Sequence, residues 1–150
     1  MMLADIRQCV ADRVATAGID AATTVHAYPP KDYALPTVLV LPASDQYVNY
    51  HGTFGSSRLM EVNLIVRVMV PEGGSTQSGQ ERLDEFLSSG TAEDLGLADA
   101  ISGADVTIGT GTADIYVSSA ENYITGQLER STTTPVHSCD LPVIVRVKRI

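Results

Sequence analysis

One apolar stretch constrains the fold of this chain more than any other. It is "RLMEVNLIVRVMV", residues 58–70, and the polar run "PEGGSTQSGQ" follows it at once. Side chains on a strand alternate between two faces, so a strand here presents one continuous apolar row. That row consists of Met60, Val62, Leu64, Val66, Val68 and Val70. It must pack on a core, which calls for a sheet with at least one covered face.

The opposite row of this strand is neither a solvated surface nor a clean core. It consists of Leu59, Glu61, Asn63, Ile65, Arg67 and Met69. The last stretch, "DLPVIVRVKRI", repeats the pattern, with Leu141, Val143, Val145 and Val147 on one face and Ile144, Arg146, Lys148 and Ile150 on the other. Antiparallel pairs allow one face to be partly wet, so we expect the two strands to be neighbours. Glu61 would then lie across from Arg146 or Lys148, a cross-strand ion pair worth a fraction of a kcal/mol.

Length and composition bound the rest of the architecture. A chain of 150 residues fits one ordinary domain, 1–150, without a second core. No apolar run approaches the roughly 20 residues that span a bilayer, and the start, "MMLADIRQCVADRV", does not read as a secretory signal. The two cysteines, Cys9 and Cys139, form no disulfide framework. We therefore expect a soluble, intracellular protein that does not bind membranes.

The net charge of −8 argues against a protein that binds nucleic acid by neutralising phosphates. The charges are unevenly distributed along the chain. Acidic residues dominate between Glu81 and Asp105, where Arg82 is the basic residue, whereas the chain ends with Arg146, Lys148 and Arg149. Two interpretations stay open. The acids and bases are either solvated surfaces and a protected strand edge, or complementary charges that join copies or partners.

The remaining pattern alternates helices and strands. Helices are predicted over 3–17, ended by Gly18, over 78–90, opened by a capping box of Ser78 and Glu81, and over 92–102, capped by Thr91. Strands are predicted over 24–30, 36–42, 105–109 and 113–119, with a hairpin over 44–57 and an extended loop or second hairpin over 120–139. The fold class is therefore α+β. We expect a mainly antiparallel sheet with an N-terminal helix and two central helices packed on one face.

Motifs for chemistry are weak throughout the sequence. "TIGTGTAD" lacks the spacing of a phosphate-binding loop and precedes a strand rather than a helix. His137 and Cys139 could ligate zinc, but no paired motif supplies the other ligands of a closed site. No nucleophile elbow of the Gly-x-Ser-x-Gly kind is present. We therefore predict no enzyme activity, and no catalytic, cofactor-binding or metal-binding residues.

Aromatic residues gather in one part of the chain, from Tyr28 to Phe54. Tyr47, Tyr50 and Phe54 lie in the predicted hairpin, where a monomer would normally place polar residues. Tyrosine and phenylalanine are favoured at protein interfaces because they offer large contact areas at small entropic cost. Either these rings form an interface, or they fold back and cover the bottom of the core.

The order of these segments resembles the tail terminator, or tail completion, proteins of long-tailed bacteriophages, and the related neck proteins that join head to tail. The resemblance rests on the helix "LADIRQCVADRV", the proline-bracketed strand in "YPPKDYALPTVLVLP", the long strand "RLMEVNLIVRVMVP", the helix "QERLDEFLSS", the short helix "LADAI" and the closing strand "LPVIVRVKR". It covers nearly the full length. It is a resemblance of order and spacing, not of an invariant motif.

The resemblance implies a structural virion protein that forms a ring, typically of six copies, at the head-proximal end of the tail. Its partners would be other copies of itself, the tail tube protein and a head connector or neck protein, with DNA only as passing cargo. It would assemble in the cytoplasm of a bacterial host and need no cofactor. The candidate interface residues are Tyr47, Tyr50, Phe54, Glu61, Arg67, Arg146 and Lys148.

Two other functions remain open. A head-to-tail connector, or neck, protein of similar fold would share this pattern. A small intracellular ligand-binding or enzyme domain would instead need a concave pocket with convergent polar groups and a perturbed titrating residue.

Overall fold

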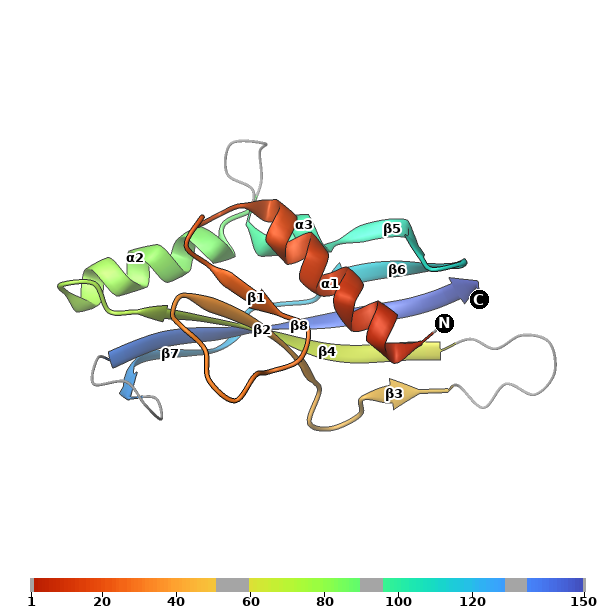
Figure 1. Cartoon of the computed structure of the whole chain (residues 1–150), viewed down its shortest axis with the longest axis horizontal. Helices are drawn as coiled ribbons and strands as arrows, with labels where there is room; N and C mark the ends of the chain where they lie inside the picture. The colour runs from red at the N-terminus through yellow and green to blue at the C-terminus, as the bar shows by residue number, and fades with distance from the viewer. Residues whose placement is uncertain (1, 51–59, 90–95, 129–134, 150) are drawn as a thin grey trace.

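The computed structural model describes residues 2–50, 60–89, 96–128 and 135–149, which form a sheet of eight strands together with three helices (Figure 1). The helices are α1 (Leu3–Ala17), α2 (Thr76–Leu87) and α3 (Leu97–Ile101). The strands are β1 (Thr24–His26), β2 (Thr37–Pro42), β3 (Val48–Asn49), β4 (Met60–Pro71), β5 (Gly103–Ile108), β6 (Gly111–Val117), β7 (Glu121–Leu128) and β8 (Pro135–Arg149).

The two long strands β4 and β8 form the central ribbon of the sheet (Figure 1). They pair antiparallel from Met60 opposite Val147 to Pro71 opposite Val136, which confirms that they are neighbours. The strand order is β1-β2-β4-β8-β6-β5, with β3 also paired to β4 and β7 also paired to β8. β2 and β3 therefore pair with different parts of the outer edge of β4, and β6 and β7 with different parts of the outer edge of β8. The β1–β2 pair is parallel and the other pairs among the described strands are antiparallel.

The predicted apolar row of β4 faces the main core. Val62, Leu64, Val66, Val68 and Val70 are all buried there, whereas Met60 packs against the edge of the core. The same core holds Leu141, Val143, Val145 and Val147 of β8, and buried residues from each of the three helices. Full burial of one such apolar side chain contributes about 1.5–3 kcal/mol. This main core therefore joins the two long strands to all three described helices.

Arg7 of α1 is buried, although charged side chains are almost never fully buried unless they are paired. It is 5% exposed. Its Nε donates to the carbonyl oxygen of Ala27 at 2.8 Å, and its Nη2 donates to that of Val40. The guanidinium also lies 4.0 Å from the ring centroid of Tyr28. Arg7 can be buried here because it satisfies backbone carbonyls of two other segments, a contact that hydrophobic periodicity does not register.

The predicted start of α2 is wrong by a few residues. The helix begins at Thr76, and the Oγ of Ser75, not Ser78, accepts the capping hydrogen bond, at 3.1 Å from the Ser78 nitrogen. Glu81 accepts from Gln77 one turn earlier instead of closing a capping box. The helix ends at Leu87, before the predicted Gly90, which lies outside the described residues.

The predicted helix over 92–102 is described only in its second half, since Thr91 and the residues up to 95 lie outside the described part. There α3 begins after Gly96, whose N–H donates to the Asp99 carboxylate at 3.4 Å.

The segment 120–139 contains paired strands. β7 pairs antiparallel with the first part of β8, with Glu121 opposite Asp140 and Ile124 opposite Ser138. Of the two interpretations of this segment, the hairpin is therefore the one observed. The closing strand starts at Pro135, five residues earlier than the apolar run alone indicated. In the predicted hairpin over 44–57, β3 pairs with β4 through Val48 and Val62, and residues 51–57 lie outside the described part.

Candidate functional site

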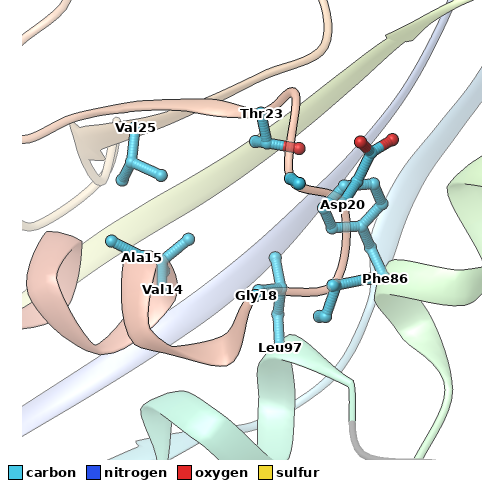
Figure 2. A pocket seen from close by; sticks show the side chains of 10 residues that line it. Val14, Ala15, Gly18, Asp20, Thr23, Val25, Phe86 and Leu97 are labelled. Atoms are coloured by element: carbon cyan, nitrogen blue, oxygen red, sulfur yellow. The ribbon is translucent and has the colours of Figure 1, made fainter.

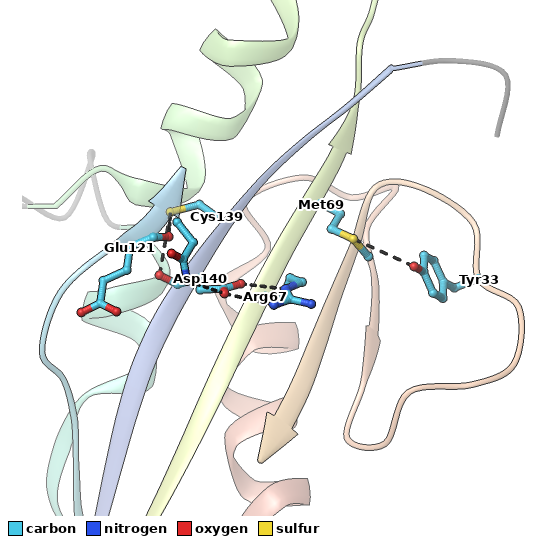
Figure 3. Close-up of polar contacts among 7 residues, drawn as sticks. Tyr33, Arg67, Met69, Glu121, Cys139 and Asp140 are labelled. Carbon is cyan, nitrogen blue, oxygen red and sulfur yellow. Dashed lines mark hydrogen bonds and ion pairs between the residues drawn. The ribbon is translucent and has the colours of Figure 1, made fainter. Parts of the chain in front are cut away.

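The second face of the sheet is covered over only part of its length. At one end Leu39, Met69 and Val136 form a small buried cluster, against which Tyr33, Leu35 and Leu41 pack. Figure 3 shows Tyr33 reaching from its loop to the Met69 sulfur, 4.0 Å away. Beyond this cluster, Ile65, Pro142 and Ile144 are only half-buried. We call this second side of β4 and β8 the open face.

Glu61 and Arg146 face each other across the central ribbon on the open face. They are direct register partners, and Arg146 Nη2 lies 3.3 Å from Glu61 Oε2, as the alternating pattern predicted. The side chains are 17% and 57% exposed, respectively. Solvent-exposed ion pairs typically contribute about 0–1 kcal/mol, so this pair adds little to stability. The pair does, however, hold one acidic and one basic side chain at fixed positions on the open face.

Arg67 makes a tighter pair on the same face, with a residue that the sequence analysis did not select. Its Nε lies 2.8 Å from Asp140 Oδ1 and its Nη2 lies 3.1 Å from Oδ2 (Figure 3). Asn122 also donates to Oδ2, at 3.2 Å. The Asp140 side chain is 7% exposed. The sequence could have predicted this ion pair, because the register that pairs Glu61 with Arg146 also pairs Arg67 with Asp140.

Lys148 does not join this arrangement. Its Nζ donates to Asp105 at 2.7 Å and lies 3.5 Å from Asp114, so it binds acids of β5 and β6 and not Glu61. The hydrogen bond to Asp105 raises the pKa of Lys148. Acids of the same chain therefore partly compensate the basic end of β8.

The structure describes two of the three candidate aromatic residues and places them in different surroundings. Tyr47 packs against the main core, as the alternative interpretation of a ring folded onto the core required. Tyr50 follows β3 and is 68% exposed. Phe54 lies outside the described residues. Of the two described rings, Tyr50 is the more exposed.

A pocket of about 260 Å³ lies between the end of α1, the segment that follows it, and α2 and α3 (Figure 2). Val14, Phe86 and Leu97 are among the apolar side chains that line it. Asp20 supplies its charge, and Arg82 Nη2 lies 2.8 Å from the Asp20 carboxylate. Hydrogen bonds from Arg82 and from the Ala22 N–H lower the pKa of Asp20. The carboxylate therefore already has structural partners.

The pair considered for zinc is held by other groups. His137 is fully buried, accepts from the Gly126 N–H at 3.3 Å through Nδ1, and has Nε2 3.5 Å from Glu72. The Cys139 sulfur lies 3.2 Å from the Glu121 carbonyl oxygen, and burial raises the pKa of this thiol (Figure 3). Within the described ranges, no group of three or more His, Cys, Asp or Glu residues is placed to hold a metal ion. Across the same ranges, no helix is long and apolar enough to cross a membrane.

Comparison with known proteins finds a likeness in fold among solved structures. No protein-family model matches this chain, and no curated protein matches it. Among solved structures, a chain from the virion of a native gene transfer agent particle is similar in fold, with a TM-score of 0.58 and 17% sequence identity. The alignment covers 95% of this chain and 93% of that one. At this identity the likeness establishes the fold over nearly the full length of both chains.

Proposed function

We propose that this protein is a structural component of a phage-like virion, and specifically a tail terminator. In this role copies of the chain form a ring that caps the tail tube and then offers its other side to the head. The ring is of six copies, as the resemblance of segment order implies. The protein acts by binding and not by catalysis, and it requires no cofactor.

The observation that carries this proposal is the open face. A sheet face with half-buried Ile65 and Ile144 between two fixed ion pairs suits contact with another protein better than contact with water alone. The fold likeness to a chain of a gene transfer agent virion supports the same class of role. Interface residues in this proposal are Tyr50, Phe54, Glu61, Arg67 and Arg146. Tyr47 lies at the margin because its ring packs against the main core, and Lys148 because its partners Asp105 and Asp114 are on β5 and β6, outside the central ribbon.

Partners and location follow from the proposed role. The ring contacts the tail tube protein on one side and a head connector or neck protein on the other, with DNA passing through it. Its net charge of −8 is suited to a channel that must not hold DNA, because like charges repel. The protein would be assembled in the cytoplasm of a bacterial host and remain at the head-proximal end of the tail.

The decisive experiment replaces Tyr50 and Phe54 together by serine and assays the capping of tail tubes by electron microscopy. We expect a folded protein that no longer caps tubes, because two interface rings are lost. Tyr28→Ser is a matched control, since Tyr28 is also exposed, at 53%, but stacks on Arg7. Tails of normal length that still join heads with the double variant would contradict the interface assignment.

The alternative functions give different results in binding assays. A neck protein of this fold would bind the head connector and ignore the tube, and purified components distinguish the two by co-sedimentation. A ligand-binding domain would use the pocket beside Asp20, so a small molecule would raise the melting temperature of a protein that ignores tube protein. Binding to tubes with no such thermal shift supports the terminator.

A further inference from the structure

Four charged side chains stand at the corners of a rectangle on the open face. Glu61 on β4 lies opposite Arg146 on β8, and Arg67 on β4 lies opposite Asp140 on β8. The two rows are separated by six positions of β4, from 61 to 67, which is roughly 20 Å along a strand. In the first row the acid is on β4 and the base on β8, whereas in the second row the base is on β4 and the acid on β8. The sign of the charge therefore alternates around the rectangle. We call these four residues the charge quartet.

An alternating quartet is complementary to itself. Consider a second copy laid face to face on the first, with a two-fold axis running along the strands between β4 and β8. The β4 strand of each copy then lies over the β8 strand of the other. Glu61 meets Arg146 of the second copy, and Arg67 meets Asp140 of the second copy. This is the isologous arrangement typical of two-fold dimers, in which one patch contacts the same patch.

The neighbouring strands select this axis over the other possible one. Asp114 on β6 extends the row of Arg146, and Glu121 on β7 extends the row of Asp140. An axis running across the strands would place Asp114 of one copy over Glu121 of the other, and like charges in contact are unfavourable. The axis along the strands instead places Asp114 over Asn49 of β3, and Glu121 over the end of the face where Tyr33 and Leu35 cover Leu39 of β2. These four residues carry no charge.

Charged and apolar side chains of the open face are exposed enough to contact a second copy. Both bases protrude, since the side chains of Arg67 and Arg146 are 43% and 57% exposed. Half-buried Ile65, Pro142 and Ile144 lie between the two rows, and covering them gains about 25 cal/mol for each Å² of apolar surface. We propose that the open face pairs with the open face of a second copy. This goes beyond the proposed function, because it concerns the free protein and requires no tail.

Sedimentation velocity of the purified chain over a range of concentrations tests the pairing. We expect a reversible dimer, weakened by salt, because exposed charges are screened. Arg146→Glu should weaken dimerisation by about tenfold or more, since it places two acids opposite each other. Arg82→Glu is the matched control. It makes the same charge change and breaks the ion pair with Asp20, away from the open face, and should leave dimerisation unchanged.

Two further variants keep the test independent of folding effects. Mixing Arg146→Glu with Glu61→Arg should restore a dimer of the two different chains, because the unlike charges then meet. The exchange Glu61→Arg/Arg146→Glu within one chain keeps the internal ion pair and should dimerise like the wild type. A wild type that is monomeric at every concentration would overturn the proposal. So would equal effects of Arg146→Glu and Arg82→Glu, or loss of dimers in the exchanged variant.

Discussion

Gly79 in α2 and His137 in β8 are packed so closely that no side chain fits between them. A Cβ on residue 79 would lie 2.3 Å from His137 Cδ2 and 2.5 Å from its Nε2. Real Cβ atoms do not approach other atoms to such distances, and the imidazole is fully buried. The first turn of α2 can therefore lie on the sheet at this point only because residue 79 is glycine.

Gly79→Ala should destabilise the protein although alanine is the better helix former. The gain in helix propensity is about 1 kcal/mol, whereas overpacking in a core typically costs about 1–3 kcal/mol. Urea unfolding would show a lower midpoint than that of the wild type. Ser78→Ala, at the exposed preceding position, is the control and should change little. Gly79→Ala should cost less stability in a His137→Ala background than in the wild type, because the imidazole is then absent. An equal cost in both backgrounds would show that the clash is not the cause.

Removal of Arg67 should cost more stability than removal of Arg146. Arg67→Gln leaves the Asp140 carboxylate, which is 7% exposed, without its bidentate partner. This should lower the free energy of unfolding by about 1–3 kcal/mol. Arg146→Gln breaks a more exposed pair and should cost less than about 1 kcal/mol. Chemical denaturation at low protein concentration measures both changes. Equal losses would show that burial of the acid does not decide the effect.

Tyr123 should ionise at higher pH than an ordinary tyrosine. Partial desolvation of this ring, which is 41% exposed, and then its hydrogen bond to Asp84 at 3.0 Å raise the pKa of Tyr123 to about 12. Because the folded state holds the proton more tightly, the stabilisation is fully present below pH 10. It is lost as the pH rises from about 10 towards 12. The tyrosinate absorbance of wild type minus that of Tyr123→Phe gives this titration, and Asp84→Asn should shift it to lower pH.

Arg7→Lys should destabilise the protein despite keeping the charge. Lysine lacks the planar fork that reaches the carbonyl oxygens of Ala27 and Val40 together. A buried carbonyl left without a donor costs about 1–3 kcal/mol. Arg13→Lys is the comparison, since Arg13 also donates to two carbonyls but is only half-buried, so its loss should be smaller. Thermal melting of both variants gives the order, and a reversed order would contradict the role given to burial.

The parts of the fold that follow from short-range alternation could be predicted. The two faces of β4 and β8, their pairing, and the Glu61–Arg146 contact all follow from side chains alternating along two long strands. The partner of Arg67 was within reach of the same reasoning. The apolar run alone puts Asp140 at the start of the closing strand, whereas β8 begins at Pro135 and Asp140 lies within its paired part.

The parts that depend on contacts between distant segments could not be predicted. Both Ser75 and Ser78 can cap a helix, and the choice depends on where Gly79 meets His137, far along the chain. The burial of Arg7 depends on carbonyl oxygens of residues that fold back beside α1. Tyr47 and Tyr50 are three residues apart, yet only the path of β3 places one on the core and leaves the other exposed.

The continuous pairing of β4 with β8 has a mechanical consequence. All 12 residues of β4 are in register with β8, and short strands flank both. A pull along the strand direction must shear many of these backbone hydrogen bonds at once, whereas a pull across the strands would open them one after another. The molecule is therefore expected to be stiffest along its central ribbon, and a load applied in that direction would reach both ends of the sheet before the fold yields.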